Sequence, residues 1–283
     1  MKIPRHIVLS RKGFDSKYGG CASPILANGT LVSMPIHDEG MSLRYRDINT
    51  VGGECNFGDL VSKLKGCNVA PDLGVHLDPD LRQELHGPGN ASWRPLFGQS
   101  DAAERHLEKQ EVGPNDLFLF FGWFRRVDQS LQFERSVHDE HVVWGWLQVD
   151  HYFDPTEIEP EWAKRHPHCI NKQRKYNRVY VGRESLSFAM SKPGAGTFAA
   201  YDSDLRLTHP DQARRRSQWR IPSFFQGKLT YHKTTKWILD GSYCTISSAK
   251  IGREFVFDTA GREQEVQKWL RSLFSHVPNG KSF

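Results

Sequence analysis

The chain has 283 residues and a formal net charge of +5, a mildly basic balance that is compatible with a nucleic-acid partner. With 38% hydrophobic and 25% charged residues it can bury a core, which excludes wholesale disorder. The five cysteines include no CxxC pair, so a disulfide framework is not expected. No apolar run approaches the roughly 18–20 residues of a membrane helix, and the first residues lack a signal-peptide core. These features predict a cytoplasmic protein with no membrane partner.

The first apolar segment, His6–Ser10, predicts a strand that leads directly into a glycine-containing loop. Arg11 and Lys12 place two cations at the start of this loop, and Asp15 and Ser16 can hydrogen-bond nearby backbone amides. A strand followed by such a loop is typical of a phosphate site, although the spacing matches neither the Walker nor the dinucleotide fingerprint. An ordinary capped turn is the alternative.

A hairpin and a helix are predicted further along the chain. Asn28 and Gly29 lie between two apolar pairs, which is a strong signal for a hairpin turn. A helix is expected up to about Gln110, with Ser100 or Asp101 as its N-cap.

The segment HLDPDL brings an imidazole and two carboxylates together in a short stretch. His76, Asp78 and Asp80 are its polar members, and the two aspartates would lie on one side of an extended segment. Such a group can bind a metal ion or perform acid–base chemistry. Pro79 makes the segment equally typical of a turn that enters a helix.

Two aromatic-rich apolar segments predict the centre of a sheet. Leu117–Phe121 is typical of a strand that is buried on both faces, and Val142–Val149 has the composition of its neighbour. The two are expected to pair across the charged loop Arg126–Glu140. Gly122 and Gly145 each lie beside a tryptophan, which indicates bulges or places where another group approaches the backbone.

The segment Asp154–Lys175 is polar and predicts a long loop or a lid. His166, His168 and Cys169 suggest zinc, but no fourth ligand and no second ligand pair occur at a recognisable spacing. We therefore expect no metal site in this segment. The run Arg214–Arg216, which has aromatic residues nearby, predicts either contact with phosphates or a solvated basic face.

The remaining signals complete an α+β fold. They are strands at Asn177–Gly182, Phe198–Leu207, within Leu229–Ser248 and at Glu254–Phe257, and helices near Phe57–Lys65 and at Glu263–Phe274. No repeat or linker is evident, so a single domain over residues 1–283 is expected. The predicted architecture is a mixed, aromatic-rich β-sheet or a partly open barrel with flanking helices and a C-terminal helix.

Several uncommon sequence strings occur here in one order: SRKGFDSKYGG, HLDPDL, LFGQSDAAERHL, NDLFLFFGWFR, HVVWGWLQV and REFVFD. Together they resemble the nucleotide modification associated domain family, type 3, of bacteria and phages, from about Ile7 to Phe257. The resemblance implies an α+β domain that acts on nucleic acid or nucleotides, with DNA favoured, and that works with the enzymes of a modification or defence system. The family-like positions are Arg11, Asp15, Ser16, His76, Asp78, Asp80, Gln99 and Arg125.

On the enzyme hypothesis, the resemblance and the residue chemistry together assign four groups of residues. The catalytic candidates are Asp15, His76, Asp78 and Asp80. The nucleotide-binding or phosphate-binding candidates are Arg11, Lys12, Ser16, Gln99 and Arg125. The candidates for stacking on a flipped base are Trp123, Trp144 and Trp146, and those for contact with a nucleic-acid backbone are Arg214, Arg215 and Arg216.

Two other hypotheses use the same sequence differently. A non-catalytic reader of modified bases, similar to PUA and EVE domains, needs stacking aromatics and basic flanks but no titratable group in its pocket. A structural partner within a modification operon needs neither stacking aromatics nor a titratable group in a pocket. No cofactor is specified by any of the motifs.

Overall fold

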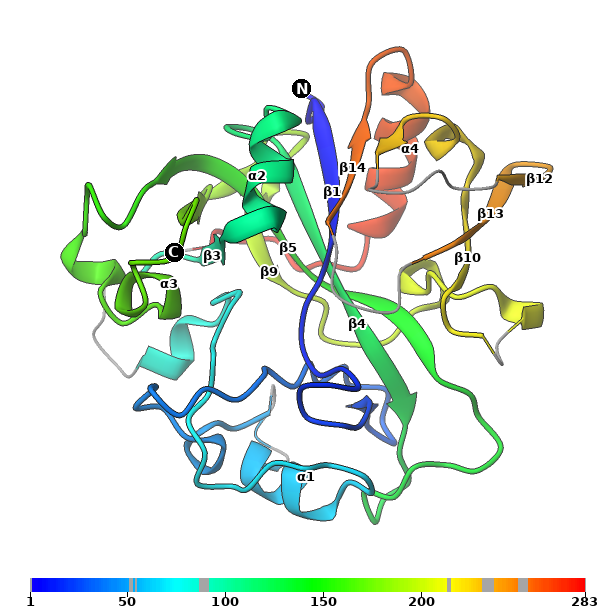
Figure 1. Ribbon diagram of the computed structural model, residues 1–283. Helices are drawn as coiled ribbons and strands as arrows, with labels where there is room; N and C mark the ends of the chain where they lie inside the picture. The colour runs from blue at the N-terminus through cyan, green and yellow to red at the C-terminus, as the bar shows by residue number, and fades with distance from the viewer. Residues whose placement is uncertain are drawn as a thin grey trace.

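The computed structural model describes residues 2–50, 53, 55–86, 92–212, 215–230, 237–248 and 254–282. Its main sheet is built from β1 (His6–Arg11), β2 (Ser23–Ile25), β3 (Leu96–Gln99), β4 (Leu117–Arg126), β5 (Glu140–Phe153), β6 (Arg178–Gly182), β9 (Ala195–Thr197), β11 (Leu229–Thr230) and β14 (Glu254–Asp258). Among the described residues the strand order is β11-β14-β1-β4-β5-β6-β3, while β2 also pairs with β4 and β9 with β5 (Figure 1). β4 is parallel to β1 and antiparallel to β5, so the sheet is mixed.

Helices and two smaller sheets surround the main sheet. The helices are α1 (Phe57–Lys63), α2 (Asp101–Lys109), α3 (Pro167–Ile170) and α4 (Glu263–Leu273). The smaller sheets are the pair β7 (Ser185–Leu186) and β8 (Ala189–Pro193), and the trio β10 (Gln218–Pro222), β12 (Ile238–Asp240) and β13 (Tyr243–Ser247). In the part of the chain that is described, none of the helices has the length and apolar character needed to cross a bilayer.

This architecture confirms the predicted α+β class, with a mixed sheet, flanking helices and a C-terminal helix; the described strands form no closed barrel. The strand predicted at Phe198–Leu207 is wrong. β9 ends at Thr197, and Ser203–Leu205 forms a short 3-10 turn. Asp202 explains the difference, because its side chain accepts a hydrogen bond from the Asp204 amide and favours a capped turn over a strand.

β4 and β5 pair as predicted, and they do so in the antiparallel sense with an irregular register. Phe120 pairs with Gly145, whereas Phe121 pairs with Val143. Trp144 is therefore the extra residue of a β-bulge, next to the glycine that indicated one. The bulge lies in the most buried part of the sheet, since the apolar half of β4 is almost fully inaccessible.

The bulge sends the two tryptophans of β5 to different neighbours. Trp144 lies against Phe120, with ring centroids 5.9 Å apart. Trp146 lies instead against Phe198 and Phe274, at 4.8 and 5.2 Å. Trp146 is only 2% exposed and is a core residue, so it offers no open ring face to a base. The stacking prediction is corrected for this residue.

Gly122 lets the chain that leaves β1 run close to β4. A Cβ atom at Gly122 would lie 2.9 Å from the Lys12 carbonyl oxygen, which is closer than such atoms approach. The Lys12 amide donates to the Phe121 carbonyl at 2.8 Å. This close approach, which the glycine beside an aromatic residue predicted, fixes the position of Lys12.

Apart from β2, the described residues between 13 and 86 form a layer below the end of the sheet in Figure 1, around α1. This layer has its own apolar core, which includes Phe14, Tyr45 and Phe57. The Tyr45 hydroxyl donates to the Pro35 carbonyl at 2.6 Å and ties two parts of the layer together. The layer supports the segment that carries Asp78.

We predict that Trp146→Ala lowers the free energy of unfolding by about 3–5 kcal/mol, because it leaves a cavity between α4 and the sheet. Trp146→Phe keeps most of the ring volume and should cost clearly less. Urea denaturation of both variants tests this. A loss below about 1 kcal/mol for Trp146→Ala would contradict the core assignment.

Candidate active site

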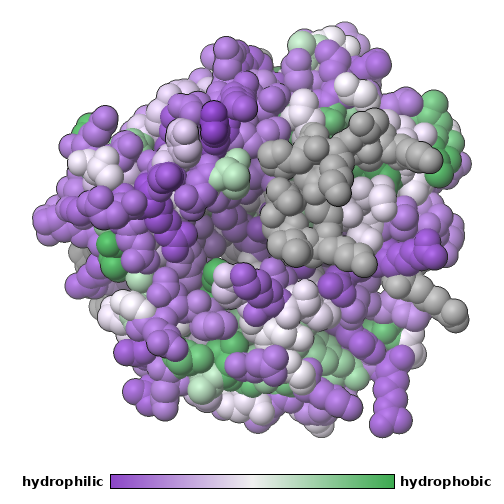
Figure 2. Space-filling view, viewed as in Figure 1, coloured by the Kyte–Doolittle hydropathy of each residue, from purple (hydrophilic) through white to green (hydrophobic). Residues whose placement is uncertain are grey.

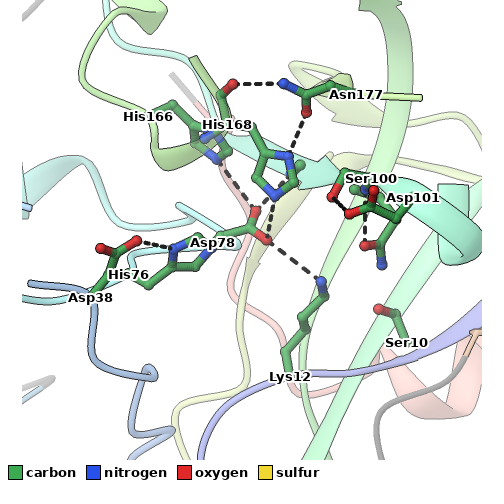
Figure 3. Close-up of polar contacts among 12 residues, drawn as sticks. Ser10, Lys12, Asp38, His76, Asp78, Ser100, Asp101, His166, His168 and Asn177 are labelled. Carbon is green, nitrogen blue, oxygen red and sulfur yellow. Dashed lines mark hydrogen bonds and ion pairs between the residues drawn. The ribbon is translucent and has the colours of Figure 1, made fainter. Parts of the chain in front are cut away.

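The site is organised around the carboxylate of Asp78, whose side chain is only 3% exposed. Its Oδ1 accepts a hydrogen bond from the Gly98 amide at 2.6 Å. Lys12 Nζ lies 3.5 Å from Oδ2, His166 Nε2 lies 3.3 Å from Oδ1, and His168 Nε2 lies 3.8 Å from Oδ2. Figure 3 shows Lys12, His166 and His168 around the carboxylate, which they reach from separate segments of the chain.

The surroundings of Asp78 keep it ionised. Burial opposes its charge, but the Lys12 ammonium and the neighbouring His166 imidazole hold the pKa of Asp78 well below its usual range. Lys12 is itself stabilised by the face of Phe97, whose centroid lies 4.3 Å from Nζ. The buried negative charge of Asp78 is therefore stabilised by Lys12 and His166, which the fold holds beside it.

α3 and the residue before it supply two imidazoles in defined tautomers. His166 Nδ1 accepts a hydrogen bond from the His168 amide at 3.3 Å, so its proton is on Nε2, the atom near Asp78. The Asn177 amide group donates to the carbonyls of His168 and Lys172, which directs Asn177 Oδ1 at His168 Nδ1, 2.7 Å away. His168 therefore carries its proton on Nδ1, and its Nε2 presents a lone pair to Asp78.

His76 is held in the same way by a different residue. Its Nδ1 lies 3.2 Å from the Asp38 carboxylate, so Nδ1 carries the proton and Nε2 presents a lone pair. Burial lowers the pKa of His76, and it lowers the pKa of His168 to about 4. Both rings are thus neutral near pH 7. One ligand atom each of His76, Asp78 and His168 lies within 4.8 Å of the others.

Gly98 is needed for this packing, although the sequence analysis did not single it out. A Cβ atom at this position would lie 2.2 Å from Cδ2 of the His168 ring. Strand β3 thus gives Asp78 an amide donor and leaves room for the imidazole. This role of Gly98 can be recognised only in the structure, where Asp78 and His168 both pack against β3.

Of the catalytic candidates, His76 and Asp78 come together, whereas Asp15 and Asp80 lie elsewhere. Asp15 Oδ1 accepts hydrogen bonds from the amides of Lys17 and Tyr18, both at 2.7 Å, as in a capped turn. Asp80 Oδ2 lies 2.8 Å from His86 Nε2 and accepts a hydrogen bond from the Trp93 indole at 3.4 Å.

The phosphate-binding candidates do not form one group. Lys12 joins the Asp78 cluster, and Gln99 donates to the buried Glu254 carboxylate at 2.5 Å. Burial raises the pKa of Glu254, a buried acid that the sequence analysis missed. Ser16 is exposed in the loop after β1.

Arg11, Arg125 and Arg216 lie in a second group, which we call the arginine cluster. Arg125 and Arg216 both approach the Asp139 carboxylate, at 3.8 and 3.3 Å. Arg216 also lies 4.0 Å from the Trp123 ring centroid, so one face of that indole is covered by a guanidinium. Burial lowers the pKa of Arg11, and the nearby Arg216 contributes to this shift. Arg215 is exposed, and Arg214 lies outside the described residues.

Two cavities border the Asp78 cluster. A small one of about 50 Å³ is lined by Asp78, Arg82 and Trp144 among others. A larger one of about 350 Å³ is lined by Asp80, His86, Lys164, Arg165 and His166, together with apolar residues. The larger volume falls within the range of small-molecule sites, roughly 300–1,000 Å³.

A family model described as nucleotide modification associated domain 3 matches residues 6–258. The chain belongs to this family. The match spans β1 to β14, includes every residue of the Asp78 cluster, and supports a role of the protein in nucleotide modification systems. No curated protein and no solved structure matches the chain at a significant level.

We predict that Gly98→Ala destabilises the protein by about 1–3 kcal/mol, because the added methyl group overlaps the His168 ring. In a His168→Ala background most of this cost should disappear. A double-mutant cycle measured by chemical denaturation tests the contact, with Gly113→Ala as a control, since its Cβ would meet Tyr152 at an ordinary 3.5 Å. An equal cost in both backgrounds would contradict the packing described here.

Proposed function

We propose that this protein is an enzyme that acts on a nucleobase or a nucleotide, with Asp78 at its catalytic centre. The observation that supports this most strongly is the buried ionised carboxylate beside Lys12 and oriented imidazoles. Burying such a charge is costly unless it is compensated, and clusters of this kind in clefts are typical of functional sites. A reader of modified bases requires no such centre, and the burial of Trp146 removes one of its stacking candidates.

The larger cavity supports a nucleotide-sized, negatively charged substrate. Lys164 and Arg165 bring cations to its lining, while His166 connects the cavity to Asp78. Asp80 and His86 provide polar groups that suit the edge of a base. A nucleotide or a base extruded from DNA would bind here, with its phosphate near the cations and its base toward the Asp78 cluster.

The arginine cluster supports DNA as the favoured partner. Guanidinium groups match phosphate geometry, and Arg125 and Arg216 share one carboxylate that a phosphate can replace. The face of the molecule shown in Figure 2 is mainly hydrophilic.

We predict that Asp78→Asn and His168→Gln each reduce nucleoside modification by about 100-fold or more, because each removes a group of the preorganised centre. Nucleoside mass spectrometry of DNA and nucleotide pools from cells that carry the modification system measures this. Circular dichroism of the purified variants confirms that they fold.

The matched control is Asp15→Asn, which keeps the turn of the loop after β1 because asparagine accepts the same amide hydrogen bonds. It should retain modification. Identical nucleoside profiles in wild type and in folded Asp78→Asn would count against the enzyme and in favour of a reader or a structural partner.

We also predict that the logarithm of the DNA-binding constant falls linearly with the logarithm of the salt concentration. Arg215→Ala should reduce the magnitude of this slope by about 1. Arg215 lies next to the arginine cluster and is exposed. Lys109→Ala, an exposed cation of α2, should leave the slope unchanged. Fluorescence anisotropy over a salt series reports both slopes, and equal slopes for wild type and Arg215→Ala would exclude this residue as a phosphate contact.

A further inference from the structure

We propose that His76, Asp78 and His168 together bind one divalent first-row transition metal ion. This inference rests on the proposed function, because it assigns a cofactor class to the same centre. The three ligand atoms lie within 4.8 Å of one another. Two imidazoles and one carboxylate form the donor set of several catalytic zinc sites and of non-haem iron sites, with positions left open for substrate or water.

The tautomers provide the first argument. Asn177 directs the His168 proton to Nδ1, and Asp38 does the same for His76. Both Nε2 atoms therefore present lone pairs toward a carboxylate that is also an acceptor. Three acceptors that converge in a buried place favour a cation near them, and the Lys12 ammonium, 3.5 Å from Asp78 Oδ2, is the cation that the described residues place there.

The distances provide the second argument. His168 Nε2 lies 3.8 Å from Asp78 Oδ2, which is too long for a hydrogen bond. Two ligands about 2.0–2.1 Å from a tetrahedral ion are separated by roughly 3.4 Å. A shift of a few tenths of an ångström would therefore bring both atoms into the coordination sphere of one ion.

The partners behind the ligands provide the third argument. Histidines that bind metals usually donate their second N–H to a carboxylate or an amide oxygen, and Asp38 and Asn177 occupy these positions. Asp78 Oδ1 is held by the Gly98 amide, which leaves Oδ2 for the ion.

Lys12 occupies the position of a counter-ion that a metal can replace. Its ammonium lies 3.5 Å from Oδ2, and the buried Glu254 carboxylate nearby has an oxygen, Oε2, without a hydrogen-bond partner among the described groups. Glu254 can therefore receive Lys12 when an ion binds Asp78. The sequence does not indicate this site, because its ligands come from two segments about ninety residues apart and not from one closely spaced motif.

The test uses the full chain, stripped of metal by a chelator and titrated with Co²⁺ as a spectroscopic probe. We expect one equivalent to bind, with visible d–d absorption that reports nitrogen and oxygen ligands, and Zn²⁺ to displace it. His168→Ala and Asp78→Ala should abolish this absorption. Asn177→Ala and Asp38→Asn, which keep all three ligands, should weaken binding by about 10–100-fold.

The control is His151→Ala, because the His151 imidazole is half exposed and paired with Asp150 away from the cluster. It should bind Co²⁺ like the wild type. Absence of stoichiometric binding by the wild type, or unchanged binding by folded His168→Ala, would overturn the metal site. Stoichiometric binding together with unchanged nucleosides in Asp78→Asn cells would instead leave the metal site standing and reject the proposed enzyme.

Discussion

The negative charge of Asp78, held away from water, is the constraint on which the rest of the site depends. An ionised carboxylate with 3% of its side chain exposed needs compensating groups around it, and the chain supplies a backbone amide, an ammonium and the His166 imidazole at 3.3 Å. None of these partners is adjacent to Asp78 in the sequence. The fold must therefore bring several segments together at Asp78. Gly98 and Gly122 allow these segments to approach one another closely.

Each segment reaches the site by a different structural feature. Lys12 directly follows β1, and Gly122 allows that stretch of chain to lie against β4. The layer around α1 presents His76 and Asp78, while Gly98 in β3 leaves space for the ring of His168. A substitution in any of these supports would move a functional group without touching the substrate.

The main strands could be predicted from sequence because their signals are local. The apolar half of β4 and its neighbour β5 are buried where their composition indicated, and α4 follows its spacing of apolar residues. The bulge at Trp144 was indicated only by Gly145. Its consequence, that Trp144 and Trp146 face different neighbours, depends on the register of two strands and could not be derived from either segment alone.

The candidate site was predictable only in part for the same reason. His76 and Asp78 were identified because they lie close together in the sequence, and the same proximity wrongly suggested that Asp80 would join them. His166 and His168 were considered for zinc and rejected because no further ligand lay near them in the sequence. Asp15 had the expected residue type and loop, but its carboxylate is used to close a turn. Tertiary contacts decide these cases.

The central claim is that fixed hydrogen-bond partners leave two neutral imidazoles with lone pairs directed at an ionised carboxylate. Nitrogen-15 NMR of the histidine side chains in the metal-free protein at neutral pH tests it most directly, because protonated and unprotonated ring nitrogens have well-separated shifts. The account predicts that His76 and His168 carry their proton on Nδ1 only and that His166 carries a proton on Nε2. A His168 ring protonated on both nitrogens, or on Nε2 alone, would contradict it.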